Sequence, residues 1–404
     1  MDLNSTPSAN RTHIGIFGKR NAGKSSLINA LTNQDIAIVS EQKGTTTDPV
    51  SKAMELLPLG PVMIIDTPGI DDEGTIGMLR VKKAYQVLNK TDIALLVIDG
   101  LQGPAQEDIE LLKHIQNKGL PVLIVYTKAT LISKDSVHYD SLNAPFVWVD
   151  SLTKTNINEL RDTIATLVPQ KLSEQPLLSD IVNPGETVIL VTPIDSSAPK
   201  GRLILPQQQV IRALLDIGAV AIVTRETELK EVLAGSGKNA DLVITDSQAF
   251  GFVAKTIPVT MPLTSFSILF ARFKGDLRET VHGAKALQAL NDGNRVLISE
   301  GCSHHRQCLD IGTVKLPTWI KQYTGKNILF EWTSGTEFPC ELSPYKMIIH
   351  CGGCMLTERE MQYRIKCAVE QSIPISNYGI TIALINGILP RALAPFPNIL
   401  AELQ

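Results

Sequence analysis

Two short groups of cysteine and histidine residues carry the most distinctive chemistry of this 404-residue chain. They are Cys302-Ser303-His304 and His350-Cys351-Gly352-Gly353-Cys354. Thiolates and imidazoles are ligands of zinc and of iron–sulfur clusters, and the paired glycines allow a tight turn that aims two thiolates at one centre. Three thiolates and an imidazole would hold Zn²⁺ tetrahedrally, whereas three thiolates would hold a 4Fe–4S cluster with one iron open to another ligand. The residues alone leave both metals open.

A glycine-rich loop near the start of the chain is the second chemical feature. It follows an apolar run at 13–17, precedes a helical pattern, and reads Gly18-Lys19-Arg20-Asn21-Ala22-Gly23-Lys24-Ser25. In such a loop backbone N–H groups surround the phosphates of a nucleotide, Lys24 reaches the β- and γ-phosphates, and Ser25 binds Mg²⁺. The predicted nucleotide contacts of this loop are Gly18, Asn21, Ala22, Gly23, Lys24, Ser25 and Ser26.

Two further motifs complete a predicted nucleotide switch. An apolar run at 62–66 ends in Asp66-Thr67-Pro68-Gly69, in which Asp66 would hold Mg²⁺ through water and Gly69 would sense the γ-phosphate. Between this motif and the loop lies a threonine-rich segment at 44–48, where Thr46 would bind Mg²⁺ only when the γ-phosphate is present. The predicted catalytic residues are Lys24, Thr46, Asp66 and Gly69.

Over residues 12–170 these motifs resemble the translation-factor-like GTPases of the tRNA-modification type. The run from Asn21 to Leu27 and a Gly-Thr-Thr-x-Asp switch are usual in that group. The resemblance implies that Asn21 helps to hold a K⁺ ion in place of an arginine finger, and that hydrolysis is slow without K⁺. Ile70 follows Gly69, so an apolar side chain replaces a water-orienting glutamine.

The base-reading motif departs from the pattern of these GTPases. Their motif is Asn/Thr-Lys-x-Asp, with the aspartate accepting from guanine N1 and N2, but this chain reads Thr127-Lys128-Ala129-Thr130. Thr130 cannot supply a charged bidentate acceptor, so guanine selectivity is expected to weaken unless Asp135 or another acidic group substitutes. The final base-contacting loop is expected at 150–153, with Ser151 as a contact. GTP and GDP remain the expected nucleotides, held at this end by Thr127, Lys128 and Ser151.

Strands that alternate with helices must position these loops, which predicts mostly parallel sheets. In the first part of the chain the expected strands are 13–17, 62–66, 93–99, 122–126 and 146–149, and the expected helices include 106–118 and 156–167. A polar, proline-bearing linker follows at 168–184, and a smaller unit then places strands at 188–194, 219–224 and 241–245.

The last part of the chain places its cysteines directly after strands. Expected strands are 295–300, 327–331 and 346–349, and ligands bind beyond the carboxyl ends of parallel strands. Thr357 and Glu360 predict a capping box for the next helix, whose N-terminus would favour an anionic cluster. We predict an α/β fold of three domains, namely a P-loop GTPase domain at 1–172, a small α/β dimerisation domain at 180–262 and an α/β cluster-binding domain at 263–404.

Composition excludes several classes of protein. An apolar fraction of 44% with 20% charged residues is that of a globular protein, and a net charge of -3 offers no basic surface for nucleic acid. The first residues lack the apolar core of a signal peptide, so a cytoplasmic location is expected, and the apolar stretch at 380–400 is too broken to span a membrane. All six cysteines lie beyond residue 300, which favours metal binding over a disulfide framework.

The whole chain resembles the FeFe-hydrogenase maturation GTPases, the HydF family. Their pattern joins a GTPase domain, a dimerisation domain and a cluster domain with Cys-x-His followed by His-Cys-x-x-Cys. The resemblance implies a 4Fe–4S cluster held by Cys302, Cys351 and Cys354, with His304 at or near the fourth iron and His350 close by. It further implies a homodimeric carrier that assembles a transient di-iron precursor, with radical-SAM maturases as donors and apo-hydrogenase as the acceptor.

Two other functions remain open at this stage. A tRNA-modification GTPase fits the first domain equally well, but such proteins end in a catalytic cysteine and no thiol lies in the last residues here. A GTPase with a structural zinc site also fits the residues. Cys308, Cys340 and Cys367 match no ligand position, and Cys367 falls within a predicted helix.

Overall fold

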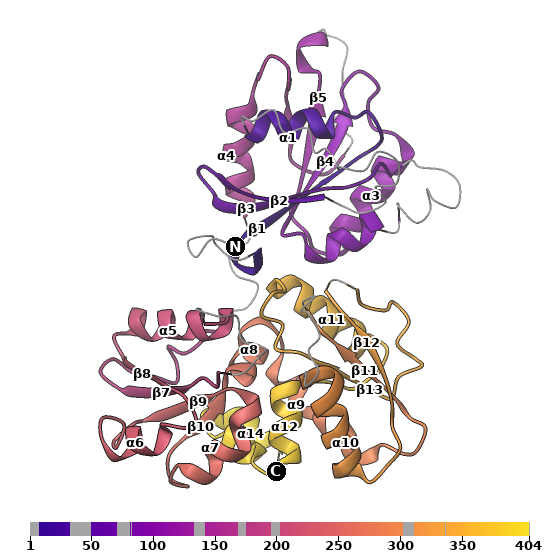
Figure 1. The fold of residues 1–404 in the computed structure, drawn as a ribbon. Helices are drawn as coiled ribbons and strands as arrows, with labels where there is room; N and C mark the ends of the chain where they lie inside the picture. Colours follow the sequence, from indigo (N-terminus) through magenta and orange to yellow (C-terminus); the bar gives the residue numbers. More distant parts are fainter. Residues whose placement is uncertain are drawn as a thin grey trace. The chain divides into compact units, whose positions relative to one another are not determined.

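The computed structural model describes residues 8–32, 50–70, 81, 83–132, 142–168, 175–194, 203–301, 311–335 and 337–403 (Figure 1). Contacts divide the chain into two compact units, Met1–Leu172 and Ser173–Gln404. Each unit is described by itself. Both are α/β, as the alternating pattern predicts.

The first unit is built on a six-stranded sheet with the order β2-β3-β1-β4-β5-β6. Its strands are β1 (Thr12–Phe17), β2 (Val50–Leu56), β3 (Gly60–Asp66), β4 (Ile93–Asp99), β5 (Val122–Thr127) and β6 (Phe146–Trp148). The described helices are α1 (Lys24–Thr32), α3 (Gln106–Asn117) and α4 (Ile157–Leu167), with short 3-10 turns at Ser8–Asn10, Leu88–Lys90 and Ala129–Leu131. All neighbouring strands are parallel except β2 and β3.

The central strands of the first unit, β1, β4 and β5, are buried on both faces. Every residue of β4 is buried, which is usual for a central parallel strand covered by helices on each side. Leu27 of α1 and Leu160 of α4 belong to the core on one face, whereas Leu111 and Ile115 of α3 belong to the core on the other. The parallel strands therefore end together at one edge, where the motif-bearing loops emerge.

The second unit contains two parallel four-stranded sheets, β10-β9-β7-β8 and β12-β11-β13-β14. Their strands are β7 (Thr187–Val191), β8 (Val220–Thr224), β9 (Leu242–Thr245), β10 (Leu263–Ser265), β11 (Arg295–Ser299), β12 (Leu329–Thr333), β13 (Met347–His350) and β14 (Ile375–Asn377). The helices are α5 (Leu205–Ile217), α6 (Leu229–Ala234), α7 (Phe250–Thr256), α8 (Phe266–Lys274), α9 (Leu277–Ala284), α10 (Leu316–Thr324), α11 (Glu358–Glu370), α12 (Tyr378–Ile385), α13 (Leu389–Ala392) and α14 (Pro397–Leu403).

One continuous apolar core joins the two sheets of the second unit. It runs from Leu178 to Phe396 and includes residues of both sheets and of α8, α9 and α12. The predicted boundary between 262 and 263 stays a prediction, although β10, which directly follows it, pairs with β9 of the first of these sheets. Within the described residues, no helix is both long and apolar enough to cross a membrane.

Candidate functional site

The loop between β1 and α1 has a backbone conformation that requires glycine at two positions. Gly18 has a φ of +141°, and a Cβ there would lie 2.2 Å from the carbonyl oxygen of Val97. Gly23 has a φ of +94°. The Thr127 hydroxyl at the end of β5 donates to the carbonyl of Ala22 over 2.9 Å, which fixes the loop against the sheet edge.

The predicted phosphate-binding side chains lie together on this loop. The Lys24 Nζ atom donates to the carbonyls of Gly18 at 2.9 Å and Lys19 at 2.6 Å, so its ammonium group lies within the curve of the loop. Ser25 and Ser26, in the first turn of α1, and Asn21 are exposed to solvent. Backbone N–H groups at a helix start, together with an ammonium group, form a site that suits polyphosphate.

Asp66 at the end of β3 suits a magnesium ion. Its Oδ1 atom is shielded from solvent and has no hydrogen-bond partner among the described residues. Burial raises the pKa of Asp66, and the charge of Lys24 opposes that rise. An unpaired carboxylate oxygen beside a phosphate loop fits Mg²⁺ or a water bound to it. Thr46, the second predicted magnesium ligand of the switch, lies outside the described residues.

The segment after Asp66 is fastened to the phosphate-loop strand. The Thr67 hydroxyl donates to the Ile16 carbonyl of β1 over 2.6 Å. Ile70 is buried in the core of the first unit, so its side chain orients no water. Gly69 lies between these two anchored residues, at the predicted γ-phosphate end of the site.

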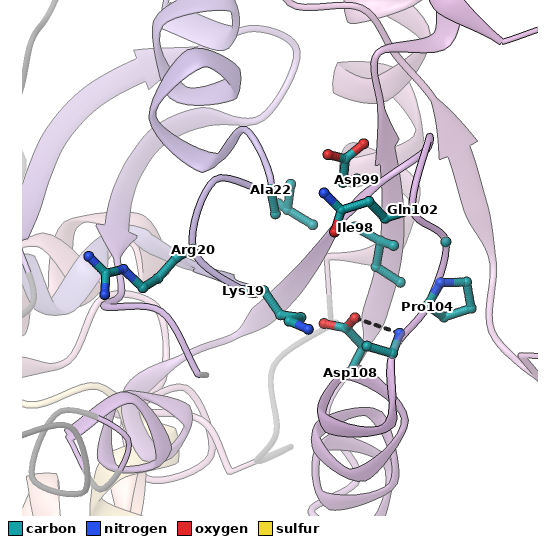
Figure 2. A pocket seen from close by; sticks show the side chains of 11 residues that line it. Lys19, Arg20, Ala22, Ile98, Asp99, Gln102, Pro104 and Asp108 are labelled. Carbon is teal, nitrogen blue, oxygen red and sulfur yellow. Dashed lines mark hydrogen bonds between the residues drawn. The ribbon is translucent and has the colours of Figure 1, made fainter. Parts of the chain in front are cut away.

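A cavity of about 130 Å³ lies beside the phosphate loop (Figure 2). The lining includes Lys19 and Arg20 of the loop, Asp99, which ends β4, and Asp108 in the first turn of α3. Figure 2 shows the Lys19 side chain pointing towards Asp108, whereas that of Arg20 points away from both carboxylates. The Asp108 carboxylate accepts from the Ala105 backbone N–H over 3.0 Å. Because the lining mixes two cations with two carboxylates, the cavity does not by itself favour an anion.

At the base-reading end, a carboxylate lies beside the position where the motif lacks one. The Thr130 hydroxyl donates to Asp150 Oδ2, and Asp150 Oδ1 accepts from the N–H groups of Leu152 at 2.9 Å and Thr153 at 3.1 Å. These hydrogen bonds, led by that of Thr130, lower the pKa of Asp150 to about 2. Asp150 is not among the contacts that the sequence predicts, although it directly precedes Ser151.

The neighbouring residues of this end are also fixed by polar contacts. Lys128 has a φ of 61°, and its Nζ atom lies 2.6 Å from Asp99 Oδ2. The Oγ atom of Ser151 is shielded and has no hydrogen-bond partner in the described part of the chain. Asp135 lies outside the described residues.

The second unit brings Cys351 next to the start of the first cysteine group. Strands β11 and β13 are neighbours, and the Gly301 N–H donates to Cys351 Sγ over 3.0 Å. The Gly353 N–H also points at this sulfur, at 3.4 Å. Gly301 directly precedes Cys302, but Cys302 and His304 lie outside the described residues and stay predicted ligands.

A buried lysine lies beside the cysteine pair. Lys274, which is 4% exposed, donates to the carbonyls of Cys354 at 3.1 Å and Leu356 at 3.0 Å. Burial lowers the pKa of Lys274 to about 8, and burial together with Cys351 raises the pKa of Cys354 to about 11. A cation and N–H donors at the sulfurs fit an anionic metal–thiolate group. The described residues do not by themselves contain a complete group of metal ligands.

His350 is held by hydrogen bonds at both ring nitrogens. Its Nδ1 atom lies 2.7 Å from the Cys351 carbonyl, and its Nε2 atom lies 2.9 Å from Arg364. Arg364 is fully buried and also binds the Glu360 carboxylate and the Ser299 hydroxyl. These contacts give His350 a structural role in the turn before the cysteines.

The start of α11 differs in one detail from the expected capping box. Thr357 caps the helix by accepting from the Glu360 N–H over 3.2 Å, as predicted. The Glu360 carboxylate, however, binds Arg364 at 2.9 Å rather than the backbone of Thr357. A buried arginine competes better for this carboxylate because it offers a charged donor.

Three family models match consecutive parts of the chain. Residues 13–128 match the 50S ribosome-binding GTPase, residues 177–275 match the hydrogen maturase F dimerization domain, and residues 278–395 match the hydrogen maturase F tetramerization domain. The first unit is therefore a P-loop GTPase domain, and the P-loop α/β fold class predicted from the sequence is confirmed.

Two curated relatives of other kinds each match little more than a third of this chain at most. The tRNA modification GTPase MnmE of Flavobacterium johnsoniae is 30% identical over 165 residues, which is 38% of this chain and 35% of that protein. GTPase Der of Kosmotoga olearia is 33% identical over 138 residues, 33% of this chain and 30% of that protein. The chain thus spans about a third of the length of these curated relatives.

Among solved structures, Era of Aquifex aeolicus is 22% identical, with a TM-score of 0.35 and coverage of 55% of this chain and 97% of that one. The two hydrogen maturase F domains lie in tandem and occupy the chain beyond the GTPase domain. Since both follow a GTPase domain in one polypeptide, the chain belongs to the hydrogen maturase F family.

Proposed function

We propose that this protein is a GTP-hydrolysing scaffold that assembles the di-iron part of the FeFe-hydrogenase active site and delivers it to the apo-hydrogenase. A 4Fe–4S cluster would be held by Cys302, Cys351 and Cys354. The observation that carries the proposal is the 3.0 Å contact between the Gly301 N–H and Cys351 Sγ. It joins the beginnings of the two cysteine groups in a chain that also carries a P-loop GTPase domain.

The donor set favours an iron–sulfur cluster over structural zinc. N–H groups aimed at a cysteine sulfur and a buried ammonium group at Lys274 both stabilise the negative charge of a cluster with thiolate ligands. When bound, such a cluster would supply one iron whose remaining coordination position is exchangeable. His304 is the proposed protein group at or near that position. The transient di-iron precursor is cargo, so a replaceable ligand suits a carrier.

In the GTPase domain, each of the predicted site residues would have a separate role in GTP hydrolysis. Lys24 would neutralise the β- and γ-phosphates, Ser25 and Thr46 would bind Mg²⁺, and Asp66 would hold it through water. We further propose that Asn21 holds K⁺ in place of an arginine finger, because Ile70 is buried and orients no water. Gly69 would sense the γ-phosphate. The loss of that phosphate on hydrolysis would then change the contacts of the protein with its partners.

The proposed partners follow from the carrier role. Radical-SAM maturases would supply the precursor, and apo-hydrogenase would receive it. The dimerization and tetramerization domains indicate that the protein associates with itself. The alternative as a tRNA-modification GTPase has less support, because the similarity to MnmE covers only 38% of the chain.

Anaerobic reconstitution with iron and sulfide, followed by EPR spectroscopy, tests the cluster. We expect iron and acid-labile sulfide to bind and a 4Fe–4S signal to appear on reduction. Cys302→Ala and Cys351→Ala are expected to lose iron, whereas Cys340→Ala, a matched change at an exposed cysteine, is expected to keep it. Zinc without iron, or spectra that are the same in the wild type and both ligand variants, would contradict the carrier function.

Hydrolysis of GTP tests the switch independently of the cluster. Phosphate release is expected to be faster in K⁺ than in Na⁺, and Lys24→Ala is expected to lower it by at least about a hundredfold, because the lost charge stabilises the transition state. Lys154→Ala, a change at an exposed lysine of the same unit, is the control. Equal rates in the two salts would contradict the proposed role of K⁺ but not the proposed hydrolysis of GTP.

A further inference from the structure

The base-reading end contains a carboxylate and a hydroxyl in an unexpected arrangement. The motif supplies a hydroxyl at Thr130, and the next loop supplies a carboxylate at Asp150 that accepts from it. We propose that Asp150 reads the guanine base in place of the aspartate that the motif lacks at position 130, and that Thr130 is its positioning residue. The inference rests on the proposed binding of guanine nucleotides and names the group that selects them.

The sheet places Asp150 beside the motif. Strands β5 and β6 are parallel neighbours, with Tyr126 opposite Trp148. The connection continues past their ends, because the Ala129 N–H donates to the Val149 carbonyl over 3.1 Å. Thr127 in turn is joined to the phosphate loop through Ala22. One edge of the sheet thus carries the phosphate loop, the motif and Asp150.

The hydrogen bonds of Asp150 leave room for a ligand. Its Oδ1 atom accepts from two backbone N–H groups, whereas Oδ2 accepts from the Thr130 hydroxyl. A carboxylate oxygen accepts about two hydrogen bonds, so Oδ2 can accept one more from a guanine N–H. Ser151 offers a second polar atom without a partner among the described residues. This surplus of acceptors at the sheet edge fits a base edge rich in N–H donors.

A purely structural role for Asp150 is the competing explanation. Its two backbone hydrogen bonds form a turn that stabilises the loop from 150 to 153, and aspartate commonly makes such turns without any ligand. Two substitutions separate the roles. Asp150→Ser keeps an oxygen that accepts from the same N–H groups but removes the carboxylate. Asp150→Asn replaces an acceptor with an N–H donor and suits xanthine, which has a carbonyl where guanine has an amino group.

The experiment measures the affinity of full-length protein for GDP, IDP, XDP and ADP with Mg²⁺ by isothermal titration calorimetry. The wild type is expected to prefer GDP over IDP and ADP. Asp150→Ser is expected to lose that preference, with GDP binding weakened about tenfold to a hundredfold, the range for hydrogen bonds to a charged group. Asp150→Asn is expected to bind XDP more tightly than the wild type does, by a similar factor.

Several results would overturn this assignment. One such result is an Asp150→Ser variant that keeps the GDP preference. Another is an Asp150→Asn variant that folds normally by circular dichroism but gains no affinity for XDP. Either result would show that Asp150 only stabilises the turn. A gain of XDP affinity in Asp135→Asn would assign the base to that residue instead. A wild type that binds ADP as well as GDP would show that no carboxylate reads the base. Failure to bind any nucleotide would contradict the proposed GTPase function as well.

Discussion

At the residue scale, hydrogen bonding distinguishes adjacent residues of the cysteine region. His350 uses both ring nitrogens on Cys351 and Arg364, so no lone pair remains for a metal in this arrangement. Cys351, by contrast, accepts from two N–H groups at its sulfur, and such donors stabilise a thiolate. The same run of residues thus holds a structural imidazole and the thiol of a proposed ligand. The position of a residue in the motif does not determine its role.

Lys274 gives a prediction at this scale. Its ammonium group lies buried beside the cysteine pair, so Lys274→Met removes a positive charge near the thiolates while keeping most of the side-chain volume. The reconstituted cluster of the variant is expected to have a more negative midpoint potential, by roughly 40 mV for about 1 kcal/mol, because the oxidised form needs the cation less. EPR-monitored redox titration measures the shift. Lys326→Met, at an exposed lysine, is the control, and equal potentials would contradict the prediction.

The pair of Thr130 and Asp150 predicts a dependence of stability on pH. The pKa of Asp150 falls from 3.8 to about 2 on folding, so the pair contributes stability above about pH 4 that is lost as the pH falls towards 2. Thr130→Val removes the largest cause of the shift and is expected to lower the free energy of unfolding by about 1–2 kcal/mol at neutral pH. The difference from the wild type is expected to shrink below pH 4.

Urea denaturation at pH 7, 4.5 and 2.5 measures that difference. Thr163→Val is the matched control, because its hydroxyl donates to the Glu159 carbonyl on α4 and to no carboxylate. Its effect is expected to be the same at every pH. A Thr130→Val effect that does not change between pH 7 and pH 2.5 would show that the Asp150 carboxylate is not stabilised by this hydroxyl.

At the element scale, the sequence predicts strands well where they are buried on both faces. The run at 93–99 reproduces β4, and those at 13–17 and 122–126 come within a residue of β1 and β5. The antiparallel strand β2 is missed because its residues are alternately exposed and include Ser51, Lys52 and Glu55, so no apolar run marks it. Strands β10 and β14 are missed because each has only three residues, of which just one is apolar. Such short strands form because they pair with neighbouring parallel strands. The pattern of residues in a single sequence carries no information about that pairing.

The candidate sites follow the same rule. Residues within one loop, such as Gly18 to Ser25, are predictable because their spacing in the sequence determines how the loop surrounds a phosphate. Contacts between loops are not, since Lys274 lies 80 positions before Cys354 and Asp150 lies 20 after Thr130. Only the pairing of strands brings these residues together. Sequence reasoning therefore finds the motifs and misses the charges that complete them.

Strand β8 is expected to form one of the contacts between protomers. It is an edge strand within the dimerization domain, and its Val220 and Val223 side chains are 51% and 45% exposed. An exposed apolar edge pairs readily with another strand, and a charge on it prevents pairing. Val223→Lys is therefore expected to shift the protein to a smaller assembly. Light scattering after size exclusion measures the mass.

Leu152→Lys is the control for the edge strand. Leu152 is 91% exposed but lies in the first unit, so the change adds the same charge outside the dimerization domain. Its mass is expected to equal that of the wild type. A Val223→Lys protein of unchanged mass would place the contact on another surface of the second unit.

At the scale of the whole molecule, the chain joins a nucleotide-binding unit to a unit in which one apolar core connects both sheets. The first unit ends at Leu172, and the second contains both hydrogen maturase F domains. Because the core of the second unit includes both of its sheets, its domains are expected to unfold together. The GTPase domain has separate cores of its own and is expected to unfold independently.

This division predicts two unfolding transitions and a selective effect of nucleotide. A ligand stabilises only the cooperative unit that it binds, by about 2.7 kcal/mol at a concentration of 100 times Kd. GDP with Mg²⁺ is therefore expected to raise the melting temperature of one transition by several degrees and to leave the other in place. Differential scanning calorimetry of the full chain measures both. In Lys24→Ala neither transition is expected to move, because the variant has lost its main phosphate contact. If GDP moved both transitions of the wild type together, the two units would be energetically coupled, and the nucleotide state would reach the cysteine region through the folded protein instead of through a change of partner.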